Sequence, residues 1–127
     1  MAKPNLIAPA TIEANNASYR YTGIALDTLA SSNWTQIISN SASSGKSYRV
    51  HSIYASNTDG TSVSTVSLVL FNGSTESGYI AYKIEIPANS TVVLVNKDAP
   101  LWLLENQTLR AARNNEVDIV CSWEEIS

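Results

Sequence analysis

The feature that most constrains the fold is a strict alternation of apolar and other residues from Tyr79 to Ile86. A period of two is typical of a β-strand with one face in a core and one face in water. One face would carry Ile80, Tyr82, Ile84 and Ile86, and the other would carry Ala81, Lys83 and Glu85. Ile84 would lie at the centre of the core face, so Ile84→Ala is expected to cost about 2–5 kcal/mol, against less than about 0.5 kcal/mol for Lys83→Ala.

A turn signal follows this alternation at once. Pro87 has no N–H to give to a sheet ladder, and Asn89 and Ser90 can bond to the nearby backbone. The chain then returns through residues 91–95, which are apolar at nearly every position, as in an inner strand covered on both faces. We therefore predict a β-hairpin over residues 79–96.

Further strand patterns occupy much of the remaining sequence. The expected strands are residues 19–26, 34–38, 47–56, 63–71, 101–104, 108–113 and 116–126, with residues 101–104 again apolar on both faces. In the 47–56 strand, a bulge near Ser52 would bring Val50 and Ile53 to the same face. In the 116–126 strand, one face would carry Val117, Ile119, Cys121 and Trp123.

Polar turn residues separate these strands. The expected turns and loops are residues 39–46, 57–61, 72–74, 97–100, 105–107 and 114–115. We expect residues 39–46 to lie in solvent, and residues 57–61 to form a tight hairpin turn in which Gly60 supplies a positive φ. Short strands at this spacing, with no amphipathic helix between them, predict an all-β fold: a single antiparallel β-sandwich, jelly-roll-like, with about eight strands.

The first residues differ from the rest of the chain. Pro4 and Pro9 disfavour both a helix and a central strand, which predicts an extended N-terminal arm over residues 1–16 that ends in a short strand, and a β-sandwich domain over residues 17–127. The arm carries Leu6 and Ile7, two large aliphatic residues that need cover. Leu6, Ile7 and Pro9 are therefore the candidate interface residues, either toward another subunit or along an edge of the same sandwich.

Size and charge limit the classes of function. A chain of 127 residues can bury a core of its own as one domain. The single cysteine, Cys121, excludes an internal disulfide and suggests a reducing compartment, and no apolar run reaches the ~18 residues that a membrane helix needs. A net charge of −3 without basic clusters argues against nucleic acid or an anionic membrane as partner.

No residue pattern predicts catalysis or a bound ion. His51 is the only histidine, and no nucleophile elbow accompanies it, so we expect an imidazole facing solvent or an interface. Residues 57–60 resemble the start of a calcium loop, but the closing glutamate is missing and Glu76 lies too far along the chain. Cys121 fits a buried strand position as a small apolar residue. We therefore expect no catalytic, cofactor-binding or metal-binding residues and no enzyme.

Two weaker possibilities involve carbohydrate. Trp34, Trp102 and Trp123, together with the six tyrosines, could form a sugar-stacking platform, although aromatic residues that alternate in strands more often lie in a core. Glu105 and the pair Glu124-Glu125 are the acidic candidates for a glycosidase, but one sequence does not fix their separation.

Several stretches together resemble a group of small structural proteins of tailed bacteriophages, particularly phages of marine cyanobacteria. The resemblance is carried by residues 48–61, 86–95 and 96–105, by the ending 120–127 with its aromatic residue and paired acids, and more loosely by residues 3–7. These are signatures at the level of the fold and include no catalytic motif.

The resemblance implies a virion structural protein of β-sandwich form, located in the virion after synthesis in the host bacterial cytoplasm. Our first expectation is a capsid decoration (cement) protein on the head; the alternatives are a neck, tail or fibre component, or a carbohydrate-binding module that contacts the host surface. The expected partners are the major capsid protein or other virion proteins, and further copies of the chain in a symmetric homo-oligomer, with a trimer favoured. Neither nucleic acid nor a membrane is expected as a partner.

Overall fold

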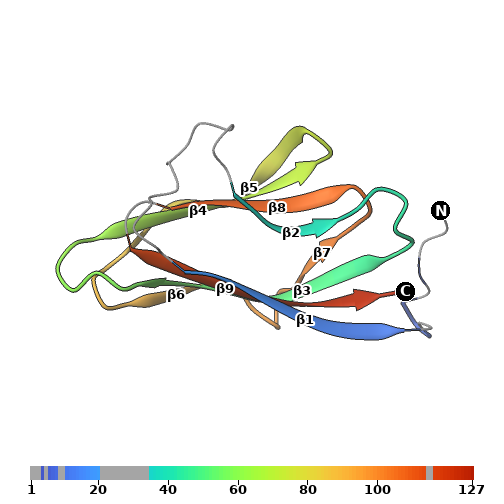
Figure 1. The fold of residues 1–127 in the computed structure, drawn as a ribbon, viewed down its shortest axis with the longest axis horizontal. Coiled ribbons are helices and arrows are strands. Elements are labelled where there is room, and N and C mark those ends of the chain that lie inside the picture. Colours follow the sequence, from blue (N-terminus) through green and yellow to red (C-terminus); the bar gives the residue numbers. More distant parts are fainter. Residues whose placement is uncertain (1–3, 5, 9–10, 21–34, 114–115) are drawn as a thin grey trace.

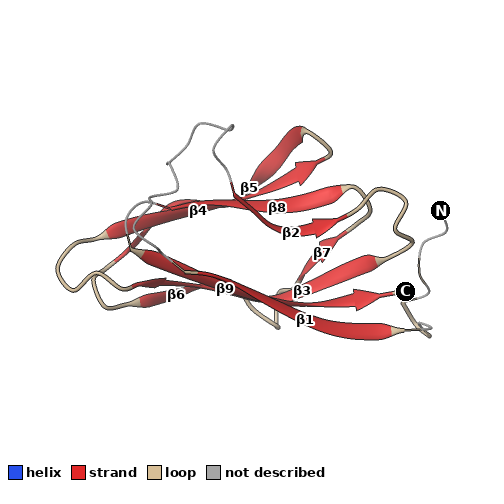
Figure 2. Ribbon diagram, in the orientation of Figure 1, coloured by secondary structure: helices blue, strands red, loops and turns tan. Residues whose placement is uncertain are grey.

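Nine strands form within the part of the chain that the computed structural model describes, which is residues 4, 6–8, 11–20, 35–113 and 116–127. They are β1 (Ile12–Tyr19), β2 (Thr35–Asn40), β3 (Ser47–Asn57), β4 (Ser64–Asn72), β5 (Thr75–Ile86), β6 (Thr91–Val95), β7 (Leu101–Leu103), β8 (Gln107–Arg113) and β9 (Val117–Ile126). The described residues contain no helix (Figure 2). The predicted all-β class is confirmed.

The strands form two antiparallel sheets that pack face to face (Figure 1). Sheet A has the order β1-β9-β3-β6, with β7 also paired to β3, and sheet B has the order β2-β8-β4-β5. Because β6 and β7 pair with different parts of β3, they form one interrupted edge strand. Counted in this way, the fold has two sheets of four strands in jelly-roll order, as predicted.

The core lies between the sheets and is built from alternating residues. On β9, Val117, Ile119 and Cys121 are buried, which confirms the predicted face of that strand. On β3, a register shift between Val50 and Ser52 places Val50 and Ile53 together in the core, which confirms the predicted bulge. β4 buries both of its faces, with Val66 and Leu68 in the main core and Val69 and Phe71 in a second cluster with Ala112.

The predicted hairpin over residues 79–96 is wrong, because β5 belongs to sheet B and β6 to sheet A. The turn between them exists, with Ser90 N donating to the Pro87 carbonyl at 3.2 Å and Asn89 at a φ of 61°. It crosses from one sheet to the other because the end of β3 holds it: Asn57 N donates to the Ser90 carbonyl at 2.8 Å.

The predicted core face of β5 is wrong in the middle of the strand, although Ile86 is buried and Ile80 packs against the core as predicted. Tyr82 is 51% exposed and Ile84 is 38% exposed, while Ala81 pairs with the buried Leu68. β5 carries an extra residue at this point: Lys83 has a φ of 49°, and its N–H donates to Ser67 Oγ at 2.8 Å. Such a bulge breaks the period of two, and β5 pairs only with β4 within the described sheets, so its other side receives no strand.

The two runs predicted to be inner strands lie at an edge. Residues 91–95 and 101–104 correspond to β6 and β7, and both pair only with β3. Val93, Trp102 and Leu104 are exposed, whereas Val95 and Leu103 are buried. In β6 and β7, a continuous apolar run therefore does not indicate that both faces of the strand are buried.

The turn at residues 57–61 does not make the predicted hairpin either, because β3 and β4 lie in different sheets. Gly60 is not among the residues with positive φ. Instead, Asp59 Oδ1 accepts hydrogen bonds from the backbone N–H of Thr61 at 2.9 Å and of Ser62 at 3.2 Å. These two donors lower the pKa of Asp59, since they favour its ionised form. The 72–74 turn is confirmed as the tip of the β4–β5 hairpin, with Gly73 at a φ of 64°.

Two buried asparagines tie the sheets together at the ends of strands. Asn57 Nδ2 donates to the carbonyls of Ile86 at 2.9 Å and Ser62 at 2.8 Å, so the end of β3 holds the end of β5. Asn40 Nδ2 donates to the carbonyls of Leu103 at 3.1 Å and Lys46 at 2.9 Å. The prediction that Asn40 lies in a loop in solvent is wrong, because Asn40 is buried and its side chain joins β2 to β7.

The N-terminal boundary lies earlier than the sequence suggested. β1 pairs with β9 along its whole length, from Ile12 opposite Ile126 to Tyr19 opposite Ile119, so residues 12–16 are part of sheet A. Residues 21–26 of the expected 19–26 strand, Trp34 and the 114–115 tip lie outside the described residues.

Candidate functional site

The outer face of sheet A carries a groove that two register shifts help to shape, one with its extra residue in β3 and one with its extra residue in β6. The register of β3 against β9 shifts around His51, and the register of β3 against β6 shifts between Ile53 and Tyr54. β-bulges turn side chains away from their regular directions and occur often beside functional sites. His51 and Ser52 are both half-buried, and Tyr54 is exposed.

The interruption of the edge strand forms the second wall of the groove. β6 ends at Val95, and the chain makes a turn before β7 begins at Leu101. Asn96 holds this turn: its Oδ1 accepts the N–H of Asp98 at 3.0 Å and of Ala99 at 3.1 Å. The turn therefore presents Lys97 and Asp98 from a backbone that local hydrogen bonds fix.

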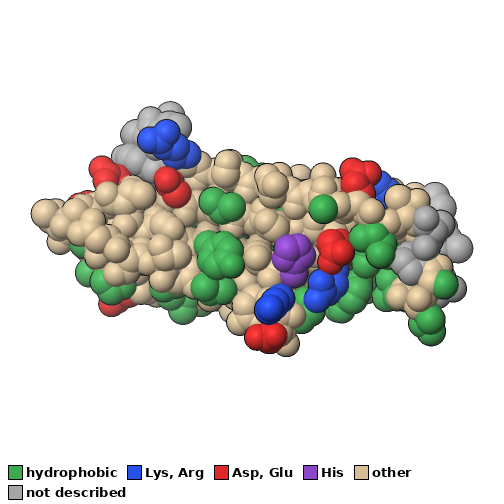
Figure 3. Space-filling view, turned by 90° about the horizontal axis from the view of Figure 1, so that it is seen from below, with side chains coloured by type: hydrophobic (Ala, Val, Ile, Leu, Met, Phe, Trp, Pro, Cys, Tyr) green, Lys and Arg blue, Asp and Glu red, His purple; other side chains and the backbone are tan. Residues whose placement is uncertain are grey.

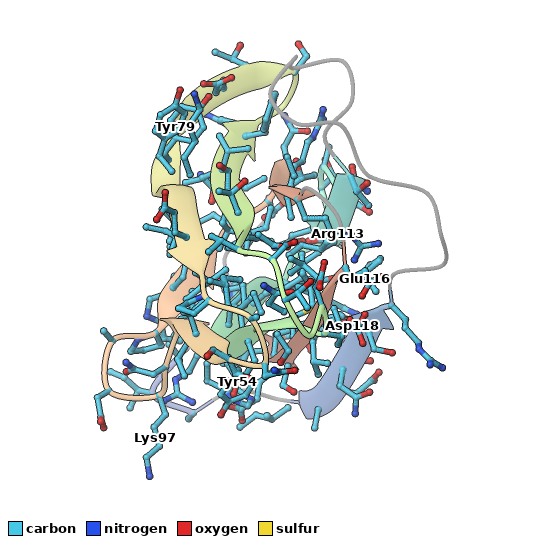
Figure 4. All side chains as sticks on the ribbon, turned by 90° about the vertical axis from the view of Figure 1, so that its left-hand side faces the viewer. Tyr54, Tyr79, Lys97, Arg113, Glu116 and Asp118 are labelled. Carbon is cyan, nitrogen blue, oxygen red and sulfur yellow. The ribbon has the colours of Figure 1, made fainter. Side chains whose placement is uncertain are left out.

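The resulting Tyr54 groove has a volume of about 390 Å³ and is lined by His51, Ser52, Tyr54, Val93, Asn96, Lys97 and Asp98. Tyr54 is 43% exposed and Val93 is 52% exposed, so an aromatic ring and an aliphatic side chain face solvent together. Figure 3 shows this outer face, with the histidine in purple among hydrophobic and charged side chains. In Figure 4, Tyr54 and Lys97 lie on the side of the molecule away from Tyr79.

Three of the polar side chains that line the groove are not used to hold the fold. Among the described residues, the structure gives the side chains of His51, Lys97 and Asp98 no hydrogen-bond or ion-pair partner. On the same face, by contrast, Arg49 donates to Glu124 Oε1 at 2.8 Å. The groove thus offers an imidazole, an ammonium and a carboxylate beside an aromatic ring, which is a set of groups suited to binding a polar ligand.

The sequence suggested an aromatic platform of tryptophans and tyrosines, but it did not single out Tyr54. Trp102 lies on the outer face of sheet A opposite Arg49, whereas Trp123 packs against the core and donates from Nε1 to Glu125 Oε2 at 3.3 Å. The signal for Tyr54 was present: the predicted bulge that places Val50 and Ile53 in the core also leaves Tyr54 facing outward.

Two of the acidic candidates, Glu124 and Glu125, are engaged in ion pairs, whereas Glu105 lines the hollow that Pro4 also lines. Glu124 pairs with Arg49, and Glu125 accepts from Lys46 Nζ at 3.1 Å. The Glu125 partner raises the pKa of Lys46. The described residues contain no group of three His, Cys, Asp or Glu side chains that could hold a metal ion.

Cys121 is a buried thiol, as predicted from its strand position. Burial raises its pKa to about 11, and the thiol donates to the Ala17 carbonyl at 3.6 Å. A thiol of this kind is almost entirely protonated at neutral pH and is a poor nucleophile.

Arg113, the last residue of β8, has a structural role. Arg113 is buried and donates from its guanidinium to the carbonyl of Tyr19 at 2.6 Å, which joins β8 to the end of β1. Burial lowers the pKa of Arg113, and Asp118 opposes that shift. Figure 4 shows Arg113, Glu116 and Asp118 at one corner of the molecule.

Of the candidate interface residues, Leu6 and Ile7 are exposed and Pro9 lies outside the described residues. Pro4 lines a smaller hollow of about 290 Å³ together with Lys46, Ser47, Asn72, Leu104, Glu105 and Gln107. Part of the arm therefore lies beside its own sandwich, while its two large aliphatic residues face outward.

Comparisons with protein-family models, curated proteins and solved structures give no match to this chain. Within the described part of the chain, no helix has the length and apolar character needed to cross a membrane.

Proposed function

We propose that this chain is a structural protein of a bacteriophage virion, and that it decorates the head as a capsid cement protein. Two things support the proposal. The sequence resembles small structural proteins of tailed phages, and the fold is a jelly roll, an architecture that viral capsid proteins use.

The observation that carries the proposal is the exposure of the arm. Leu6 is 50% exposed and Ile7 is 97% exposed. Large aliphatic side chains at a chain end, displayed from a stable domain, suit attachment to another protein surface. The partners in this proposal are the major capsid protein and further copies of the chain, as in a symmetric trimer.

The root of the arm is firmly placed. Thr11 N donates to the Ser127 carbonyl at 3.1 Å, and Ser127 N donates to the Thr11 carbonyl at 2.9 Å. The arm therefore leaves sheet A from a fixed point beside the C-terminal residue.

Copy number in purified particles tests the location. A cement protein should be present at a level close to that of the major capsid protein, as measured by quantitative gel densitometry. A neck, tail or fibre component would be scarce by comparison. A low copy number would therefore argue against a position on the capsid surface.

Deletion of residues 1–10 tests the arm. The truncated protein should melt close to the temperature of the full chain, because these residues precede β1, but it should lose oligomeric state or retention on particles. Melting is followed by circular dichroism, and retention by sedimentation with particles. Unchanged assembly and retention would show that the arm has no such role.

A further inference from the structure

We propose that the Tyr54 groove is a binding site for an uncharged saccharide of one or two sugar rings. This goes beyond attachment to a particle, because it gives the outer face of sheet A a ligand of its own. The groove volume of about 390 Å³ is at the small end of the range for ligand pockets, roughly 300–1,000 Å³.

The apolar part of the groove matches one face of a sugar ring. A pyranose presents C–H groups on its faces and hydroxyl groups around its edge. The electron-rich face of an aromatic ring attracts such partly positive hydrogens. Tyr54 is the exposed aromatic ring in the groove, and the neighbouring Val93 extends the apolar surface from β6.

The polar part of the groove matches the hydroxyl groups. Each sugar hydroxyl can donate one hydrogen bond and accept others, so a good site offers both kinds of partner. Asp98 accepts, Lys97 donates, and the two ring nitrogens of His51 add further hydrogen-bonding groups. None of these three side chains has a hydrogen-bond or ion-pair partner within the part of the chain that the structure describes.

The charges in the groove favour an uncharged ligand. Lys97 contributes one positive charge and Asp98 one negative charge, and both come from the same turn. An anionic ligand would gain from Lys97 but would be repelled by Asp98, and a cation would meet the reverse. A neutral sugar can use both groups without this penalty.

The groove is organised before any ligand arrives. The hydrogen bonds of Asn96 fix the turn that carries Lys97 and Asp98, and strand pairing of β3 with β9 and β6 fixes Tyr54. Binding then requires little ordering of the backbone, which lowers its entropic cost.

Saturation-transfer difference NMR on the full chain tests the proposal directly. The probes are the methyl glycosides of glucose, galactose, mannose and N-acetylglucosamine, each at millimolar concentration. At least one should receive saturation from the protein, with the strongest transfer to ring C–H protons. No transfer to any of the four would overturn the proposal.

Three variants locate the site. Tyr54→Ala and Asp98→Ala should each weaken the positive glycoside by roughly tenfold or more, because they remove the stacking surface and an acceptor. Tyr82→Ala removes an exposed tyrosine from β5 in the other sheet and should leave binding unchanged. Unchanged binding in both groove variants, with a folded circular dichroism spectrum, would place the sugar elsewhere and overturn the assignment. Particle retention is measured separately, so this result leaves the proposed capsid role untouched.

Discussion

β9 and β5 carry equally clear alternation in the sequence, yet only β9 follows it in the structure. On β9, Ile119 and Cys121 are buried on the predicted face. On β5, Tyr82 and Ile84, which alternation assigns to the core, are exposed. The same local pattern thus gives a correct burial pattern in one strand and a wrong one in the other.

The difference comes from the neighbours of each strand. β9 lies between β1 and β3 and exchanges backbone hydrogen bonds on both sides, so a slip of one residue would disturb two ladders. β5 pairs only with β4 in the described sheets, and the register of that pair shifts three times. Alternation is therefore a reliable guide to burial where two neighbours hold the register, and a weaker guide at an edge.

Chemical labelling of thiols should give the largest difference between the two strands. Cys121 lies fully buried on β9 and its pKa is about 11, so an alkylating reagent at pH 8 should reach it only after unfolding, at least about a thousandfold more slowly than in the denatured chain. Ile84→Cys in a Cys121→Ala background should be labelled without unfolding. Mass spectrometry over time measures both labelling rates. Similar rates would contradict the difference in burial between Cys121 and position 84.

Truncation of core side chains should give the next largest difference. Ile119→Ala is expected to lower the free energy of unfolding by about 2–5 kcal/mol, because the side chain is buried. Ile84→Ala should cost only about 1 kcal/mol, since part of the side chain remains in water. Urea denaturation measures both values. An equal loss from the two variants would mean that β5 is packed as tightly as β9.

The free energy of unfolding should depend more on contacts at the end of β5 than on side chains in the middle of the strand. Asn57→Ala removes donors to the carbonyls of Ile86 and Ser62 in a buried place, and we expect a loss of about 1–3 kcal/mol. Asn16→Ala on the exposed side of β1 is the control and should stay within about 0.5 kcal/mol. Losses of equal size would show that the Asn57 side chain does not hold the two sheets together.

The smallest expected effect concerns the bulge itself. Lys83 has a positive φ that costs an L residue about 1 kcal/mol, so Lys83→Gly should raise the free energy of unfolding by up to about 1 kcal/mol. Glu85→Gly, two residues further along β5 and outside the set with positive φ, should lower it by about 0.5–1 kcal/mol. Thermal or urea denaturation compares them; a loss in both would contradict the strained bulge.

Local chemistry in the sequence predicted the strands better than their partners. The alternation of β9, the bulge in β3 and the Asn72–Ser74 turn depend on near neighbours in the chain, and they were predictable. The sheet to which the chain passes after each turn was not predictable. Pro87 marks a turn, but the hydrogen bonds of the distant Asn57 hold that turn where the chain crosses to the other sheet. Turn residues indicate that the chain makes a turn, and contacts between residues far apart in sequence determine which strands then pair.

The candidate site shows the same limit. Tyr54 could be predicted to face outward from the bulge in β3. Its groove also needs Val93 and Asp98, which reach it because β6 stops early and pairs with β3. The residues around Asp98 predicted a turn, but they did not indicate that the strands on both sides of it pair with the same strand, β3.

The interrupted edge of sheet A also bears on how copies of this chain meet one another. An uninterrupted edge strand offers a long row of free backbone groups to which a second sheet can add, and this is a common start of aggregation. β6 and β7 offer only short rows, separated by a turn that projects Lys97 and Asp98. On the opposite sheet, the bulged β5 places a lysine at its most irregular point. Crowded copies would therefore be discouraged from joining strand to strand at these two edges, which leaves side-chain surfaces to determine which contacts form.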